Sequence, residues 1–150
     1  MLTEIQIEEN KSLNNIEELF LIERECFQDM AWSKTMLKEE LKNPFSKCFV
    51  AKEKNNVLGY LLGRVILDEG EILRLAVRPA FQKRGIGSKL LASFLEELKN
   101  LKIKRVFLEV SEENKRALRL YQKFNFNFLY FRKNYYEKNK ALVMECEILK

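Results

Sequence analysis

A chain of 150 residues, of which 47% are hydrophobic and 33% charged, suits one globular core and excludes an intrinsically disordered protein. Its net charge of +5 fits a nucleic-acid binder or a protein that holds a polyanionic cofactor. Because acidic residues are interleaved with the basic ones, we favour the cofactor and expect no direct nucleic-acid binding.

Strands and helices alternate along the chain without internal repeats or a linker, which predicts a single domain over residues 1–150. Asn14 and Glu17 have the spacing of a capping box, so the first helix is expected to begin at Asn14. The expected fold class is α/β, a mixed sheet flanked by helices. In chain order we expect a strand at 4–8, helices at 14–27 and from Ser33, strands at 47–52, 57–67 and 71–78 with a hairpin turn at Asn55-Asn56, a helix from Ile86, a strand at 105–110, a helix at 114–124, and strands at 126–132 and 141–148.

The chain has no histidine, which excludes Ser-His and Cys-His catalytic triads. Cys26, Cys48 and Cys146 lack the spacing of metal ligands and lie in apolar surroundings, so we expect reduced, buried thiols and no metal site. The apolar run at 57–67 is too short to span a bilayer, and no signal peptide is visible. These features predict a cytoplasmic protein that does not contact a membrane.

A basic turn with two glycines separates the strand at 71–78 from the helix that begins at Ile86. Backbone N–H groups at a helix N-terminus carry partial positive charge and bind anions. Gly85 and Gly87 would let the backbone approach phosphate oxygens closely. Further positive charge comes from Lys83, Arg84 and Lys89. The turn therefore predicts a site for a diphosphate.

Two common phosphate-binding loops do not match this turn. A P-loop requires G-x-x-x-x-G-K-[ST], whereas Lys89 follows Ser88. A dinucleotide-binding loop requires G-x-G-x-x-G, whereas position 90 is Leu90. The remaining pattern is Q-x-x-G-x-G at 82–87, directly after L-A-V-x-P at 75–79.

Two further segments belong with that pattern. They are the strand at 105–110 and the motif N-x-x-A-x-x-L-Y-x-x-F-x-F at 114–126. With the element order, they resemble the GCN5-related N-acetyltransferases (GNAT), whose sheet is mixed, mostly antiparallel and twisted. R-K-N-Y-Y at 132–136, and C-F at 26–27 followed by W-S at 32–33, resemble the RimI-type subgroup, the ribosomal-protein-alanine N-acetyltransferases.

The resemblance implies acetyl transfer from acetyl-CoA to a protein N-terminal α-amine, that of a ribosomal-protein alanine, directly within a ternary complex. An α-amine, with a pKa of about 7.7–8.0, is far more often neutral near pH 7 than a lysine at about 10.4. Such an acceptor needs only a weak general base to remove its proton. Because the chain has no histidine, we expect this base to be a carboxylate.

Glu109 is the candidate base, a lone carboxylate in an apolar strand that would raise its pKa. The alternative from residue pattern alone is that Glu109 pairs with Arg or Lys at a sheet surface. Tyr121 is implied by the resemblance as the acid that protonates the departing thiolate. On helical spacing alone, Tyr121 could simply be a core aromatic.

The resemblance also implies the residues that hold the two substrates. Asn114 is expected to cap its helix and contact the pantetheine arm, and the Val77 N–H is expected to polarise the thioester carbonyl. The full cofactor set is Leu75, Ala76, Val77, Gln82, Lys83, Arg84, Gly85, Ile86, Gly87, Ser88 and Asn114. The acceptor set is Trp32, Tyr135 and Tyr136 as pocket walls, with Asp68, Glu69 and Glu71 attracting a cationic amine.

Two positions depart from the family pattern. Asn125 replaces the glycine before Phe126, and asparagine tolerates the left-handed conformation that this turn requires. Ala31 replaces the proline before Trp32, in a loop expected to face the acceptor. Three alternatives stay open: a GNAT enzyme that acetylates a small-molecule amine, a non-catalytic CoA-binding regulatory module, and a basic nucleic-acid adaptor.

Overall fold

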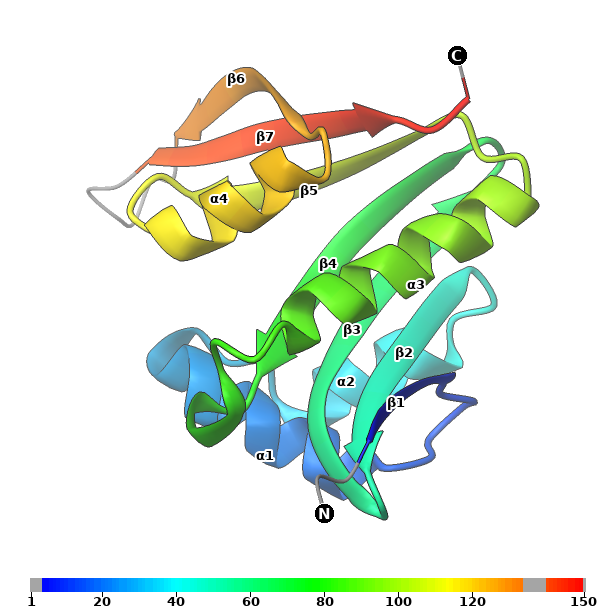
Figure 1. The fold of residues 1–150 in the computed structure, drawn as a ribbon, viewed down its shortest axis with the longest axis vertical. Helices are drawn as coiled ribbons and strands as arrows, with labels where there is room; N and C mark the ends of the chain where they lie inside the picture. The colour runs from blue at the N-terminus through cyan, green and yellow to red at the C-terminus, as the bar shows by residue number, and fades with distance from the viewer. Residues whose placement is uncertain (1–3, 134–139, 150) are drawn as a thin grey trace.

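The structure is a computed structural model that describes residues 4–133 and 140–149. Within these ranges the chain builds one seven-stranded sheet with helices on both faces (Figure 1). Its elements are β1 (Ile5–Glu9), α1 (Ile16–Phe27), the short 3-10 helix η1 (Gln28–Met30), α2 (Lys34–Lys42), β2 (Ser46–Glu53), β3 (Asn56–Ile66), β4 (Glu69–Val77), the 3-10 helix η2 (Pro79–Phe81), α3 (Ile86–Asn100), β5 (Arg105–Ser111), α4 (Lys115–Lys123), β6 (Asn127–Lys133) and β7 (Lys140–Glu147).

The strand order is β1-β2-β3-β4-β5-β7-β6. All neighbouring pairs are antiparallel except β4 and β5, so the expected mixed, mostly antiparallel sheet is confirmed. The parallel ladder joins only Glu69–Ile72 to Arg105–Leu108. Beyond it the two strands diverge, and Figure 1 shows β4 and β5 opening like the arms of a V. One edge of β4 is therefore left free of a neighbouring strand.

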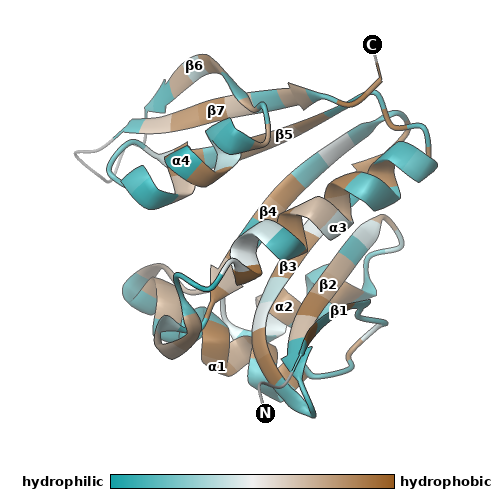
Figure 2. Ribbon diagram, viewed as in Figure 1, coloured by the Kyte–Doolittle hydropathy of each residue, from teal (hydrophilic) through white to brown (hydrophobic). Residues whose placement is uncertain are grey.

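Side-chain alternation along the strands builds two separate cores, one on each face of the sheet. On β2, Phe49 and Ala51 join the cluster beneath α3 and α4, whereas Cys48 and Val50 join the cluster beneath α1 and α2. Figure 2 shows apolar residues running along β2, β3 and β4, as strands covered on both faces require.

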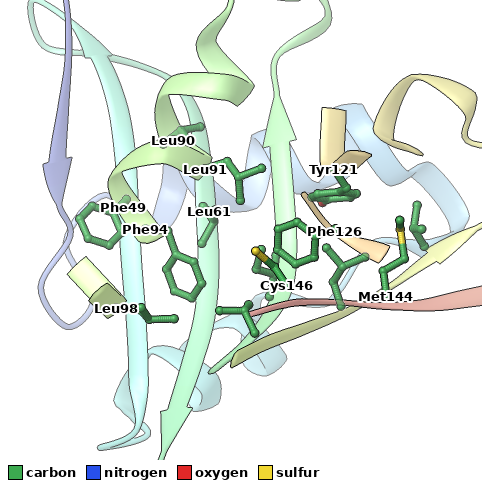
Figure 3. Close-up of a cluster of buried hydrophobic side chains, with 14 of the residues drawn as sticks. Phe49, Leu61, Leu90, Leu91, Phe94, Leu98, Tyr121, Phe126, Met144 and Cys146 are labelled. Atoms are coloured by element: carbon green, nitrogen blue, oxygen red, sulfur yellow. The ribbon is translucent and has the colours of Figure 1, made fainter. Parts of the chain in front are cut away.

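Close packing fixes α3 against the sheet (Figure 3). Phe94 is fully buried and meets Phe49 edge-on at a centroid distance of 6.5 Å. A Cβ atom on Gly63 would lie 2.7 Å from the Phe94 ring, so only glycine allows this approach. Because α3 carries the glycine turn at its N-terminus, this contact also sets where that turn lies relative to β4.

The predicted elements are confirmed, with boundaries shifted by one to a few residues. The capping box is wrong: α1 begins at Ile16, and its N-cap residue Asn15 is left-handed (φ 62°) without a side-chain cap. Instead the Asn15 amide donates to Asn10 Oδ1 at 2.8 Å, which ties the loop between β1 and α1 together. Asn125 is left-handed as expected (φ 67°).

Cys26, Cys48 and Cys146 are reduced, as expected, and Cys48 and Cys146 are buried. Cys26 is only half-buried. Among the helices in the described ranges, none combines the length and apolar character that crossing a membrane requires.

Candidate active site

A cavity of about 330 Å³ opens where β4 and β5 diverge. Its walls are the end of β4, the glycine turn, one face of α4 and the end of α1. It brings together ten of the eleven residues expected to bind the cofactor, and the expected acid. These are Leu75, Ala76, Val77, Gln82, Lys83, Gly85, Ile86, Gly87, Ser88, Asn114 and Tyr121.

The glycine turn has the backbone shape of an anion site. Lys83 (φ 67°) and Gly85 (φ 79°) are left-handed, and such alternation turns successive N–H groups toward one concavity. Gly85 is the N-cap of α3, and no side chain caps this helix. The first N–H groups of α3 therefore face the cavity ready for an anion. Arg84 does not line the cavity; it lies over the Phe81 ring at 5.3 Å, and its contact with the cofactor stays a prediction.

The free edge of β4 offers backbone groups to the cavity. Arg78 donates its backbone N–H to the Leu58 carbonyl of β3 at 2.8 Å. Because backbone groups alternate between the two edges of an antiparallel strand, the Val77 N–H points to the other edge, where β5 has diverged. It is therefore available as the single donor expected to polarise a thioester carbonyl.

A polar bridge crosses the mouth of the cavity through Gln82. The Gln82 amide donates from Nε2 to the Val77 carbonyl at 2.9 Å, and its Oε1 accepts from Arg116 Nη1 on α4. The Cys26 thiol also donates to the Val77 carbonyl at 3.2 Å. The end of β4 is thus held from α1, from the turn and from α4.

Tyr121 lies at the inner end of the cavity with its ring in the core. It is 7% exposed and packs edge-on against Phe126 at 5.6 Å (Figure 3). Burial raises the pKa of the Tyr121 phenol, because the ionised form would lose its hydration. Tyr121 is therefore protonated at neutral pH. It is both a core aromatic and a cavity residue, so the two sequence interpretations are compatible.

Glu109 is not in the apolar environment expected for it. Its side chain is 44% exposed and pairs with Arg132 Nη1 of β6 at 3.2 Å. The cause is side-chain alternation on β5, where Val106, Leu108 and Val110 face the core and Glu109 faces the other side. The alternative, an ion pair at the sheet surface, is what the structure shows.

The model of the Acetyltransferase (GNAT) family matches residues 15–126. The chain belongs to the GNAT family. It is also 37% identical over 107 residues to the [ribosomal protein bS18]-alanine N-acetyltransferase of Haemophilus ducreyi. This alignment covers 70% of this chain and 72% of that protein.

Solved structures share the fold of this acetyltransferase. The ribosomal-protein-S18-alanine N-acetyltransferase from Escherichia coli matches 97% of this chain and 94% of its own, with a TM-score of 0.89 and 23% identity. NAA60 of Arabidopsis thaliana in complex with acetyl-CoA matches 97% of this chain and 99% of its own, with a TM-score of 0.83 and 16% identity. The expected family, fold and enzyme class, an acetyl-CoA-dependent N-acetyltransferase, are confirmed.

Asn114 performs the capping role expected of it in the acetyltransferase. Its side chain accepts from the Ala117 N–H at 3.2 Å at the start of α4, and the residue also lines the cavity. Six further lining residues were missed: Cys26, Phe27, Phe81, Arg116, Ala117 and Leu120. Helical spacing could have indicated Ala117, three residues after Asn114 and four before Tyr121, and Leu120, three residues after Ala117. The pattern assigned both to the core alone.

The acceptor residues expected from the sequence are only partly brought to the site. Trp32 does not line the cavity; it is partly buried against the core beneath α1 and α2, next to Phe27, which does line it. Tyr135 and Tyr136 lie outside the described residues.

The acidic residues of the acceptor set lie at or near the start of β4, whereas the cavity lies at the end of this strand. Glu69 begins β4 and Val77 ends it, which separates them by about 26 Å at about 3.3 Å per residue. Asp68 instead pairs with Lys104 at 3.3 Å, and Glu71 lies opposite Phe107 of β5. Asp68, Glu69 and Glu71 do not line the cavity, and their attraction of the acceptor amine stays a prediction.

Proposed function

We propose that this acetyltransferase moves the acetyl group of acetyl-CoA to a protein N-terminal α-amine, that of an N-terminal alanine in a ribosomal protein. The relatives named for this reaction support the acceptor class, and the match to Haemophilus ducreyi spans most of both chains. The observation that carries the chemistry is the placement of Glu109 and Tyr121 on opposite faces of the sheet beside the β4–β5 opening.

Opposite faces suit a direct transfer. The incoming amine must lose a proton on the side from which it attacks, and the thiolate must gain one on the side from which it leaves. Glu109, exposed and in contact with Arg132, takes the amine proton directly or through water. Tyr121, buried with its phenol protonated, gives a proton to the departing sulfur.

The cofactor residues supply position and polarisation. The turn and the N-terminus of α3 hold the diphosphate, and Lys83, Arg84 and Lys89 add charge. Asn114 and the free edge of β4 hold the pantetheine arm, and the Val77 N–H stabilises the developing oxyanion. NAA60 of Arabidopsis thaliana, which shares this fold, was solved in complex with acetyl-CoA, which supports acetyl-CoA as the co-substrate.

An acetyl-cysteine route is chemically unfavourable here. Cys26 is the cysteine that lines the cavity, and burial, with Glu25 and Glu23 nearby, raises the pKa of its thiol to about 11. The thiolate is the nucleophile, so a thiol with this pKa is almost wholly unreactive at pH 7. Its proton is also engaged with the Val77 carbonyl.

The test is CoA release with two acceptor panels, one of peptides beginning with Ala, Ser, Met or Gly and one of small amines. We expect turnover on the Ala-starting peptide, and a fall of roughly 10²-fold or more for Glu109→Gln and for Tyr121→Phe. Glu96→Gln, which removes an exposed carboxylate of α3, is the control and should be unchanged. Turnover on small amines alone would exclude the protein acceptor, and full activity of either site variant would exclude the acid–base assignment.

A further inference from the structure

A fully buried carboxylate lies behind the cavity, outside the residues assigned so far. Glu23 of α1 is 0% exposed, although charged side chains are almost never fully buried unless paired. It accepts hydrogen bonds from the Tyr60 hydroxyl, from Arg74 and from a backbone N–H. The Arg74 fork is bidentate, with Nε 3.0 Å from Oε1 and Nη2 bonded to Oε2. The backbone donor is the Trp32 N–H, 2.7 Å from Oε2.

The same guanidinium holds the segment that joins α1 to α2. Arg74 Cζ lies 3.9 Å from the centroid of the Phe27 ring and 5.1 Å from that of Trp32, both within cation–π range. Arg74 Nη2 also donates to the Met30 carbonyl at 3.2 Å. Glu23 and Arg74 together hold residues 27–32 through four contacts. Arg74 contacts the Phe27 ring, the Trp32 ring and the Met30 carbonyl, and Glu23 accepts a hydrogen bond from the Trp32 N–H.

Phe27 of this segment belongs to the wall of the cavity that the cofactor does not use. The turn, the end of β4 and α4 are assigned to acetyl-CoA, which leaves the end of α1, where Phe27 lines the cavity. Arg74 directly precedes Leu75, the first β4 residue of the cavity. One residue therefore connects the strand that presents the thioester to the wall beside which an amine must approach.

We propose that Glu23 and Arg74 are positioning residues for the acceptor, and that they hold Phe27, with Trp32 on the same guanidinium, as the wall against which the acceptor's first residue packs. This inference rests on the proposed transfer to an amine acceptor. Stability alone does not account for the pair, since well-packed apolar residues often replace a buried ion pair at no cost. What an apolar pair would lose is the directional hold on the Trp32 N–H and the Met30 carbonyl.

The chain contains a matched pair that lacks this connection. Arg64 of β3 forms a bidentate pair with the buried Glu40 of α2, with Arg64 Nε 2.9 Å from Oε2. It likewise joins a helix to a neighbouring strand, but it bonds to no residue of the 27–32 segment within the described part of the chain. Loss of the Arg64 pair should therefore cost stability without changing acceptor binding.

The test compares Glu23→Gln/Arg74→Met with Glu40→Gln/Arg64→Met, because neutralising both partners leaves no buried charge unpaired. For the first variant we expect the acceptor KM to rise at least tenfold while acetyl-CoA affinity stays within twofold. Trp32 is the only tryptophan, so its emission should shift to the red in that variant and not in the control. Equal acceptor KM values in the two double variants would overturn the inference. So would a fall in the acetyl-CoA affinity of Glu23→Gln/Arg74→Met as large as the rise in its acceptor KM.

The wild-type protein decides the proposed function separately. If it acetylates small amines and not peptides, the protein acceptor fails, and the comparison of variants is made with the amine that it does use. If peptides are acetylated and the two variants share one acceptor KM, only the positioning role fails.

Discussion

Glu109 shows how far a residue's chemistry can be inferred from its neighbours in sequence. The apolar run around it indicates a buried strand, and β5 is indeed packed on one face. Whether the opposite face is covered depends on which helices cross it, and α1 and α2 contact β2, β3 and β4 instead. The exposure of Glu109 and its pairing with Arg132 therefore follow from tertiary arrangement, which no local pattern encodes.

Gly87 allows a test of the cofactor site that leaves folding intact. A Cβ atom there would lie 3.5 Å from Leu120 Cδ2 and 4.0 Å from Val77 Cγ2, which is ordinary contact. Gly87→Ala should keep or raise stability, by up to about 1 kcal/mol, since alanine favours helix. It should also weaken acetyl-CoA binding at least tenfold, because the methyl group enters the space at the α3 N-terminus. Urea unfolding and calorimetric titration measure the two effects.

Gly85→Ala is the contrasting variant. Gly85 has a φ of 79°, so an alanine there is strained by roughly 1 kcal/mol although no atom lies within 4 Å of the added Cβ. It should lower stability, which Gly87→Ala should not do. Unchanged acetyl-CoA affinity in Gly87→Ala would contradict the placement of the cofactor in this turn.

The sequence predicts every strand and α-helix of the described residues, but neither 3-10 helix and not the strand divergence that makes the site. Hydrophobic periodicity reports which residues face a core, and it placed β4, β5 and α4 correctly. The β4–β5 ladder ends after Ile72 and Leu108, which are more than 30 residues apart in the sequence. Hydrophobic periodicity does not report where such a distant pairing ends. For the same reason Cys26 and Phe27 were missed as lining residues, since about 50 residues separate them from the β4 residues they meet.

The cap of α4 links helix stability to cofactor binding. Asn114→Ala removes the bond to the Ala117 N–H and should cost about 1 kcal/mol in urea unfolding. Ser33→Ala is the matched control, because Ser33 caps α2 through the Met36 N–H at 3.1 Å and does not line the cavity. Both variants should lose similar stability, and only Asn114→Ala should bind acetyl-CoA more weakly. Equal acetyl-CoA affinity in the two variants would show that Asn114 is a cap and nothing more.

For the whole molecule, buried groups with raised pKa values set the alkaline limit of stability. Burial raises the pKa of the Cys48 thiol from 9.0 to about 12, and that of Tyr60 well above 10.0. The unfolded chain ionises Cys48 above pH 9 and Tyr60 above pH 10, while the folded protein keeps both groups neutral. Stability is therefore complete below pH 9 and falls as pH rises, by about 1.4 kcal/mol per pH unit above pH 9 for Cys48 and by a similar further amount above pH 10 for Tyr60.

Urea unfolding at pH 8, 9 and 10 in the presence of a reductant measures this slope. Cys48→Ala should be less stable at pH 8, because a buried side chain is shortened, and its stability should fall less steeply with pH. A wild-type free energy of unfolding that stays level from pH 8 to 10 would contradict the protonated, buried state of Cys48.

Transfer to an α-amine can be tested with one peptide. The peptide carries a free N-terminal alanine and an internal lysine, and is incubated with acetyl-CoA and the protein at pH 7. Fragment mass spectrometry then locates the acetyl group. We expect acetylation of the alanine nitrogen alone, dependent on both Glu109 and Tyr121. Acetylation of the lysine, or a product formed equally well by Glu109→Gln and Tyr121→Phe, would contradict it.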